Sequence, residues 1–382
     1  MFELIDEWGP EKIVCVSDTR TGMRGVLVID NTARGMGKGG TRMSTTVSVH
    51  EVARLARNMT WKWAGVDLFY GGAKAGIWAD PTSASKEDVL RAFVRALKNE
   101  VPEEYVFGLD VGLTEQDAAV MLDEVGGRGG AVGTPSALGG LPYDELGVTG
   151  HGVAESADAA ARTIGLNTNE LTVSIQGFGA VGAATAKRMA ELGATVVAVS
   201  TSQGGIHNPD GLDVAELLAL RALHGDGLVH YYGAAKPLAG GEELSVRADV
   251  LVPAALQDVI DDKLAATIPA RIVVEGANLP SSATAQQILF ERGVTVVPDF
   301  IANAGGVVAA AIAMDARHSG IRPDAAAVYD AISVKLRAST VETLVASHEQ
   351  SATTHDVARR TAQDRVREAM RLRGRSPRSI QS

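Results

Sequence analysis

Three lysines lie in or beside glycine-rich segments of the first third of the chain: Lys38 in 38–42, Lys62 in 59–62 and Lys74 in 71–76. Most lysines are solvated surface charges. Lys74 is different, because its glycines lie between the mostly apolar residues 66–70 and Ile77-Trp78. Burial in such a site lowers the pKa of a lysine toward values useful in acid–base chemistry. Two neighbouring lysines would lower this pKa further and would attract an anionic substrate.

Asp110 follows in the sequence Gly-Leu-Asp-Val-Gly, just before a helix-like segment at 115–122. The plain interpretation is an aspartate at a turn or helix start. The alternative is a carboxylate that exchanges protons with a lysine of lowered pKa. The residues alone leave both interpretations open.

A dinucleotide-binding turn is indicated at residues 177–182. Its glycines, Gly177, Gly179 and Gly182, form a G-x-G-x-x-G pattern between the strand-like 172–176 and the helix-like 180–192. The first glycine permits a tight turn, the second lets the pyrophosphate approach, and the third allows close helix–strand contact. The helix N-terminus then offers N–H groups to the phosphates. The alternative is a glycine-rich turn that binds nothing.

The choice between NAD and NADP stays open. The second strand, 195–200, runs into Thr201, Ser202 and Gln203, where an NAD enzyme usually has a carboxylate for the ribose 2′-OH. These hydroxyls would not repel a 2′-phosphate, and no arginine is there to attract one. We therefore expect NADP or dual use rather than strict use of NAD.

Composition limits the class of protein. The chain has 382 residues, 46% of them hydrophobic and 21% charged, and its net charge of −10 does not favour nucleic acid. The single Cys15 fits a reducing compartment. The acidic N-terminus does not resemble a signal peptide, and the most apolar run, 307–314, is shorter than the roughly 20 residues of a membrane helix. We expect a cytoplasmic protein that binds neither membrane nor nucleic acid and has no metal site.

The order of elements predicts an α/β fold with two domains. Strands at 12–17 and 23–29 precede helices at 49–64 and 86–98, the latter with Ser85 as N-cap and Val89, Phe93 and Leu97 on one face. From 146 to 334 strands and helices alternate, as in a doubly wound Rossmann sheet. The chain is helical and charged beyond about 335.

These motifs together resemble the glutamate/leucine/phenylalanine/valine dehydrogenase family. The matching stretches, in the family's order, are 38–42, 59–62, 71–81, 110–112, 149–153, 176–182, 252–256, 275–278 and 298–307. The resemblance implies a substrate-binding and oligomerisation domain formed by 1–145 and 335–382, and a dinucleotide-binding domain formed by 146–334. It also implies a homo-oligomer and reversible oxidative deamination of an L-amino acid to its 2-oxo acid and ammonia, with NAD or NADP as cofactor.

The resemblance also implies a role for individual residues. Lys74 and Asp110 match the catalytic pair, and Lys62 matches the lysine that holds the α-carboxylate. The other implied substrate contacts are Lys38, Gly39, Gly40, Met59 and Asn303. The implied cofactor contacts are Thr149, Gly177, Phe178, Gly179, Ala180, Val181, Gly182, Ser200, Thr201, Ala254, Ala255 and Asn278.

The amino acid is indicated by Lys38. In the glutamate enzymes of the family a lysine here meets the side-chain carboxylate, whereas leucine-type enzymes have an apolar residue. The stretch 133–140 is also glutamate-like. Against this, Ala310 stands where glutamate enzymes usually have serine, and the N-terminal region before Lys38 is short, as in leucine-type enzymes.

Glutamate is therefore our first expectation and a branched-chain or aromatic amino acid the second. A third possibility is a non-catalytic relative that senses nucleotide or amino acid. The presence of Lys62, Lys74 and Asp110 together favours an enzyme.

Overall fold

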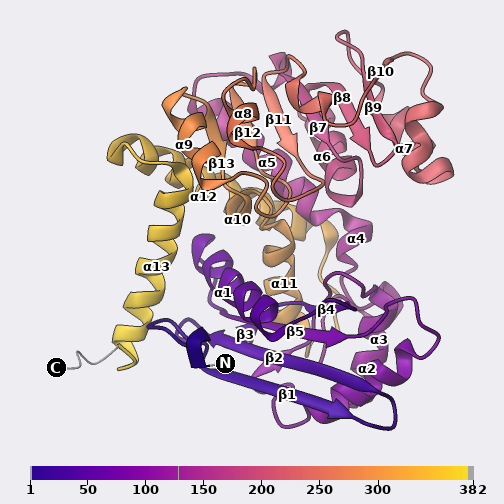
Figure 1. Ribbon diagram of the computed structural model, residues 1–382, viewed down its shortest axis with the longest axis vertical. Coiled ribbons are helices and arrows are strands. Elements are labelled where there is room, and N and C mark those ends of the chain that lie inside the picture. Colours follow the sequence, from indigo (N-terminus) through magenta and orange to yellow (C-terminus); the bar gives the residue numbers. More distant parts are fainter. Residues whose placement is uncertain (1, 128, 377–382) are drawn as a thin grey trace. The chain divides into compact units, whose positions relative to one another are not determined.

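The computed structural model describes residues 2–127 and 129–376, and the chain folds into two compact units (Figure 1). Unit 1 consists of Met1–Tyr143, Ala309–Ala325 and Arg360–Ser382. Unit 2 consists of Asp144–Val308 and Ala326–Arg359. Residues 377–382, which close the expected first domain, lie outside the described part.

Unit 1 contains a six-stranded mixed sheet in the order β1-β2-β5-β3-β6, with β4 also paired to β5. Its strands are β1 (Lys12–Asp18), β2 (Met23–Asn31), β3 (Gly37–Lys38), β4 (Thr41–Ser44), β5 (Gly71–Trp78) and β6 (Tyr105–Val106). Strands β1, β2 and β5 are antiparallel, whereas β3 and β4 run parallel to β5. Strand β5 is therefore central, and both edges of its backbone are paired.

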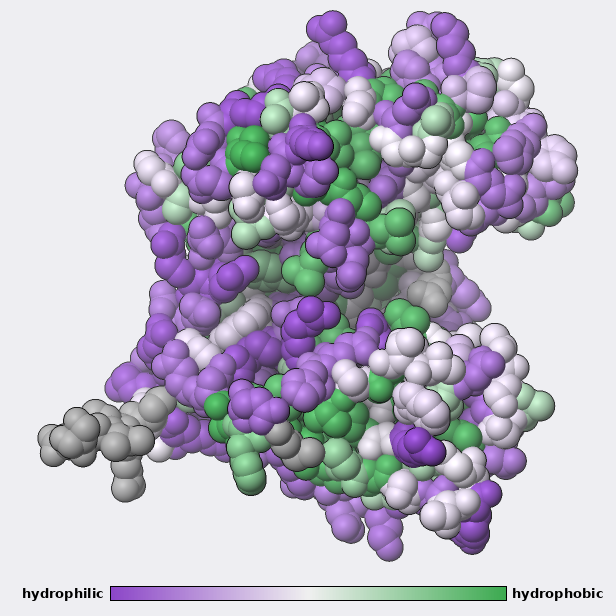
Figure 2. Space-filling model, viewed as in Figure 1, coloured by the Kyte–Doolittle hydropathy of each residue, from purple (hydrophilic) through white to green (hydrophobic). Residues whose placement is uncertain are grey.

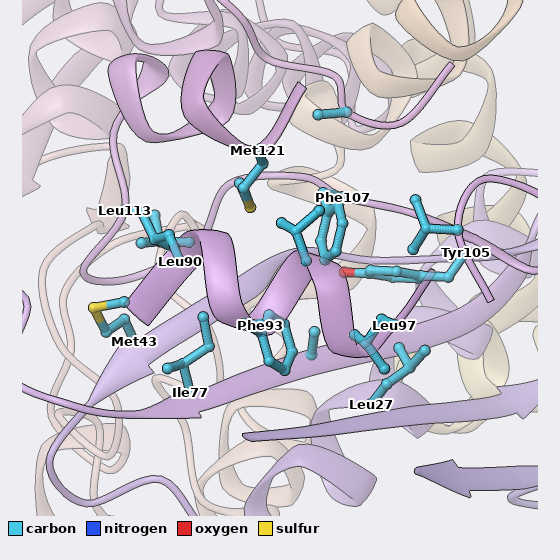
Figure 3. Close-up of a cluster of buried hydrophobic side chains, with 14 of the residues drawn as sticks. Leu27, Met43, Ile77, Leu90, Phe93, Leu97, Tyr105, Phe107, Leu113 and Met121 are labelled. Atoms are coloured by element: carbon cyan, nitrogen blue, oxygen red, sulfur yellow. The ribbon is translucent and has the colours of Figure 1, made fainter. Parts of the chain in front are cut away.

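Three helices belong to this sheet: α1 (Val49–Gly65), α2 (Lys86–Ala96) and α3 (Glu115–Val125). The side chains of Val89, Phe93 and Leu97, the C-cap residue of α2, all belong to the buried core cluster. Figure 3 shows Phe93 and Leu97 with Ile77 of β5 in this cluster. The expected apolar face of this helix is thus confirmed. Ser85 is the N-cap residue as expected, but its hydroxyl pairs with Ser83 instead of a helix N–H.

Unit 2 contains a seven-stranded sheet in the order β10-β9-β8-β7-β11-β12-β13. Its strands are β7 (Thr172–Gln176), β8 (Thr195–Thr201), β9 (Gly204–His207), β10 (Lys236–Leu238), β11 (Val250–Pro253), β12 (Ile272–Val274) and β13 (Thr295–Val297). Strands β8, β7, β11, β12 and β13 are parallel, and the first strand, β7, has β8 on one side and β11 on the other. The strand order reverses there, as in a Rossmann sheet, so the expected α/β fold class is confirmed.

The other α-helices of the described chain, in sequence order, are α4 (Tyr143–Leu146), α5 (Val148–Thr163), α6 (Ala180–Glu191), α7 (Val214–His224), α8 (Asp262–Ala265), α9 (Ala283–Glu291), α10 (Asp299–Ala302), α11 (Gly305–Ala316), α12 (Ala325–Gln350) and α13 (Thr354–Leu372). Most of α11 and of α13 belongs to unit 1. The segment Asp299–Ala316 is apolar and long enough to cross a membrane by length and composition alone, but 67% of it is buried inside the protein. The segment is divided into two helices, α10 and α11, and its burial is typical of the core helices of a globular protein. The visible surface is mostly hydrophilic, with smaller apolar areas between (Figure 2).

The unit boundaries differ from those expected at the C-terminal end. Arg337 of α12 forms ion pairs with Glu155 and Asp158 of α5, whose side chains are 1% and 0% exposed. Since such buried carboxylates need a partner, α12 belongs to unit 2 and not to unit 1. Residues 309–325 belong to unit 1, although we expected all of 146–334 in the dinucleotide-binding domain. After α12 the chain returns to unit 1 at residue 360, and Arg365 there donates to the carbonyls of Ala64 and Gly65.

We expect Phe93→Ala to lower the free energy of unfolding by about 3–5 kcal/mol, because it leaves a cavity in the fully buried cluster. Urea denaturation followed by circular dichroism measures the loss. Phe2→Ala is the matched control, since Phe2 is 88% exposed and should change stability by less than about 0.5 kcal/mol. Equal losses for the two variants would contradict this description of the core.

Candidate active site

The structure brings Lys74 and Asp110 into direct contact. Lys74 lies in the central strand β5 and is only 7% exposed, and its Nζ is 2.9 Å from Oδ2 of Asp110. The side chain of Asp110 is 21% exposed. The two residues expected to form a catalytic pair therefore form an ion pair at the edge of a buried region.

Arg42 is a third member of this site that the sequence analysis did not single out. Its Nε donates to the same Oδ2 of Asp110 at 2.9 Å, and its Nη1 donates to Glu51 of α1 at 2.7 Å. Burial raises the pKa of Asp110, but the charges of Lys74 and Arg42 and the hydrogen bonds from both outweigh it. The pKa of Asp110 therefore lies below its usual value. Asp110 is held as a carboxylate.

Close backbone contacts position this pair. A Cβ atom on Gly39 would lie 1.7 Å from the carbonyl oxygen of Ala73 in β5, and one on Gly40 would lie 2.9 Å from Cβ of Asp110. The N–H of Thr41 donates to the carbonyl of Gly108 at 2.8 Å. Glycine is required at 39 and 40 because any side chain would separate the segment that carries Asp110 from β5.

Lys38 is buried, with 2% of its surface exposed, and its ammonium group donates to three main-chain carbonyls. These belong to Val106 at 2.9 Å, Phe107 at 3.2 Å and Gly39 at 3.3 Å. Burial, together with the charges of Lys74 and Arg317, lowers the pKa of Lys38 to about 7. We expected cations to gather around Lys74, and in the structure the charge of Lys74 lowers the pKa of its neighbour Lys38. The ammonium group of Lys38 uses its three N–H donors in these hydrogen bonds to carbonyls.

Helix α1 carries Met59 and Lys62 on the same side as the glycine segment. The Cγ atom of Met59 is 3.3 Å from the place that a Cβ on Gly39 would occupy. Trp63, one residue beyond Lys62, donates from Nε1 to the carbonyl of Lys38 at 3.0 Å. Because positions three residues apart share a helix face, Lys62 follows Met59 toward this segment. Lys62 is half-buried in the last turn of the helix.

The glycine turn of unit 2 has the geometry of a phosphate-binding site. Gly177 has φ of +87°, and Gly182 packs so closely that a Cβ would be 1.9 Å from the carbonyl oxygen of Gly177. A Cβ at Gly179, in contrast, would meet no neighbouring atom within 4 Å. Helix α6 begins at Ala180, so the N–H groups of Ala180 and Val181 have no partner within the helix. Open space in front of these N–H groups fits a pyrophosphate.

Two of the expected cofactor residues shape the turn. The side chain of Phe178 is 1% exposed, and its N–H donates to the carbonyl of Ser200 at 2.6 Å. The hydroxyl of Ser200 accepts from the N–H of Gly177 at 3.0 Å. Phe178 and Ser200 therefore fasten the turn to the end of β8. Thr201 follows, and its hydroxyl donates to the carbonyl of Asp226.

Ala254 and Ala255, two more of the expected cofactor contacts, follow the carboxyl end of β11. Ala255, just after β11, is the residue that a Cβ on Gly177 would meet, at 2.5 Å, and the N–H of Ala254 donates to Gln176 at 2.8 Å. This is the point where the strand order reverses and where ligands bind in open α/β sheets.

Asn303 and Asn278 meet at the same edge of the sheet. The Nδ2 of Asn303 donates to Oδ1 of Asn278 at 3.0 Å. Thr149 of α5 packs against Gly305 and Gly306. The structure thus gathers the residues expected around the nicotinamide within unit 2. Among residues 2–127 and 129–376, no group of three or more His, Cys, Asp or Glu residues could hold a metal ion.

A buried network supports Asn278. Glu275, at the end of β12, accepts from the N–H of Asp299 at 3.0 Å and pairs with Nε2 of His355 at 2.7 Å. Burial lowers the pKa of His355, but the charge of Glu275, its hydrogen bond and the charge of Asp299 together outweigh burial, so this pKa is raised. The hydrogen bonds of Glu275 to Asp299 and His355 therefore hold the segment 275–278 in place.

Comparison with known proteins agrees with this geometry. Residues 139–374 match the family model described as Glutamate/Leucine/Phenylalanine/Valine dehydrogenase, and residues 10–126 match the dimerisation domain of Glu/Leu/Phe/Val dehydrogenases. The NADP-specific glutamate dehydrogenase of Saccharolobus shibatae is 36% identical over 96% of this chain and 90% of its own. The glutamate dehydrogenase of Thermotoga maritima is 40% identical over 74% of this chain and 70% of its own.

Solved structures show the same likeness. The hetero-hexameric glutamate dehydrogenase of Thermus thermophilus is 31% identical, with a TM-score of 0.85, and the match covers 96% of this chain and 91% of that one. The protein belongs to the Glutamate/Leucine/Phenylalanine/Valine dehydrogenase family. It is an oxidoreductase that uses NAD or NADP and acts on an amino acid.

We expect Gly179→Ala to keep the melting temperature but to weaken NADH binding by at least about tenfold, because the methyl group enters the space for the pyrophosphate. Gly182→Ala should lower both the melting temperature and the affinity for NADH, because its Cβ collides with the carbonyl oxygen of Gly177. Fluorescence titration with NADH and thermal melting separate the two effects. Normal NADH binding by Gly179→Ala would contradict the placement of the phosphates.

Proposed function

We propose that this protein is a glutamate dehydrogenase, which reversibly converts L-glutamate to 2-oxoglutarate and ammonia. The observation that carries the proposal is the 2.9 Å ion pair of Lys74 and Asp110 in a site with Lys38 beside it. The names of the relatives from Saccharolobus shibatae and Thermotoga maritima support it.

In the proposed reaction Lys62 binds the α-carboxylate and fixes the substrate through one charged contact. The substrate ammonium first gives one proton to solvent, and bound NAD or NADP would supply the hydride acceptor for Cα. Water attacks the resulting iminium carbon, and Lys74 orients that water and stabilises the oxygen charge that develops. Asp110 takes a proton from the attacking water and gives it to the amino nitrogen. As this nitrogen leaves as ammonia, Asp110 takes the remaining hydroxyl proton and the carbonyl of the 2-oxo acid forms. The short contact between Lys74 and Asp110 gives these protons a direct path.

Charge supports glutamate over neutral amino acids. The ammonium of Lys38 and the guanidinium of Arg317 lie close enough for the charge of Arg317 to lower the pKa of Lys38. The Nε of Arg317 is buried and has no hydrogen-bond partner among the described residues. A substrate carboxylate would compensate both cations. The substrate carboxylate would replace one of the two longer hydrogen bonds that Lys38 donates to carbonyls. Ala310 has no hydroxyl, so it would not donate a hydrogen bond to this carboxylate.

We also infer that the protein forms a homo-oligomer. Residues 10–126 match a dimerisation domain, which supports contact between copies of unit 1. The similar structure from Thermus thermophilus is described as hetero-hexameric. Analytical ultracentrifugation tests this inference, and a monomer at micromolar concentration would refute it.

We expect Lys74→Ala to reduce turnover about 10³-fold or more, because proton transfer and charge stabilisation at the reacting carbon are lost together. The dissociation constant for NADH should change less than about threefold, since the residues that hold the cofactor belong to unit 2. Lys98→Ala, which alters an exposed lysine of the same unit, is the control and should leave turnover unchanged. Unchanged turnover in Lys74→Ala would remove its catalytic role.

The substrate assignment is tested by comparing kcat/KM for L-glutamate with that for L-norvaline, whose side chain is neutral. We expect kcat/KM for L-glutamate to be at least about 10² times that for L-norvaline, because a hydrogen bond to a charged group contributes a free energy of this size. The ratio should fall from about pH 6 to about pH 9, because Lys38, with its pKa of about 7, loses its charge as the pH rises. Lys38→Met should give a small ratio that does not vary with pH. A wild-type preference for norvaline or leucine would overturn glutamate as substrate.

A further inference from the structure

The end of strand β8 decides which cofactor fits. Hydrogen bonds from Gly177 and Phe178 to Ser200 place this end directly beside the phosphate-binding turn. In Rossmann folds the adenosine ribose lies at this point, and an acidic residue there binds its 2′-OH. The strand itself ends in Thr201 and Ser202, so it does not provide such a residue.

The structure supplies a carboxylate from another segment. Asp226 lies in the 3₁₀ helix Gly225–His230, which is distant in sequence from the strand. Its Oδ2 accepts a hydrogen bond from the hydroxyl of Ser202 at 2.6 Å, and its carbonyl accepts one from the hydroxyl of Thr201 at 2.7 Å. Two contacts therefore fasten Asp226 to the end of β8. Asp226 is exposed, so its carboxylate remains open to a ligand.

We propose that Asp226 takes the place of the missing acidic residue and makes the protein select NAD over NADP. Its carboxylate would accept hydrogen bonds from the ribose hydroxyls of NAD and would repel the 2′-phosphate of NADP. This inference concerns the cofactor alone and holds whichever amino acid is the substrate. It reverses the expectation from the strand sequence, which favoured NADP or dual use.

The surrounding charges favour the same choice. Residues 189–220, which include the whole β8–β9 hairpin, contain neither lysine nor arginine. Arg188, just before this stretch, forms ion pairs with Glu155 and Glu191. A 2′-phosphate at the hairpin would therefore meet a carboxylate without a compensating cation from this stretch.

The test is direct cofactor binding by the whole protein without any amino acid, measured by fluorescence titration with NADH and NADPH. We expect the wild type to bind NADH at least tenfold more tightly than NADPH. Asp226→Asn should tighten NADPH binding about tenfold and weaken NADH binding severalfold, because the repulsion and one strong acceptor are both removed.

Asp210→Asn is the matched control. It also removes one exposed carboxylate of unit 2, but Asp210 follows β9, where Leu212 pairs with Val196 near the start of β8. It therefore lies at the opposite end of the strand and should not change the ratio of the two affinities. Asp226→Ser serves as a second variant, and thermal melting checks that each variant is folded.

A wild type that binds NADPH as tightly as NADH, or an unchanged ratio in both folded Asp226 variants, would overturn the role of Asp226. Neither result bears on glutamate, because no substrate is present in the titration. Conversely, a chain that is inactive with glutamate but shows the expected shift in NADPH affinity would refute the substrate and leave the role of Asp226 intact.

Discussion

The ion pair of Lys74 and Asp110 is the interaction on which the chemistry of unit 1 depends. A lysine on a central, buried strand is costly unless its charge is compensated. Asp110 provides that compensation only because the main chain at Gly39 and Gly40 approaches β5 and the segment of Asp110 without intervening side chains. The glycine segments are therefore part of the arrangement that holds this charged pair. They allow the two charged groups to meet, and Arg42 donates to the same carboxylate oxygen as Lys74.

Unit 2 uses glycine for a different physical purpose. There Gly182 permits contact between helix α6 and the turn, whereas Gly179 leaves space for a ligand. Three buried carboxylates of this unit have partners within it: Glu155 and Asp158 pair with Arg337, and Glu275 pairs with His355. The contacts of Arg337 join helices α12 and α5, and Glu275 holds the segment that carries Asn278. In unit 1 the side chains of Lys38 and Arg317 donate to main-chain carbonyls and form no ion pair with a carboxylate of the described residues, which suits a region that receives an anion.

The selectivity that we propose for both units depends on the placement of single charges. A cation in a nearly dry environment discriminates strongly between a substrate with a side-chain carboxylate and one without it, because the unpaired alternative leaves a charge uncompensated. For Asp226 the effect is repulsive, because its carboxylate and the 2′-phosphate of NADP are both negatively charged. Family membership defines the class of reaction, and in our proposals these few local charges select the amino acid and the dinucleotide that take part in it.

The sequence by itself determined the α/β class and the Rossmann turn, because glycine spacing and the alternation of strands and helices are local properties. Lys74 and Asp110 were singled out together only by the family resemblance, since the residues around Asp110 left its role open. The tertiary structure alone decided three other features. It assigned α12 to unit 2 through contacts with α5, tied the ammonium of Lys38 to main-chain carbonyls, and brought Asp226 to the end of β8. Each of these features depends on contacts between residues that are distant in sequence; Arg337 and Glu155, for example, are 182 positions apart. A local sequence pattern does not predict such contacts.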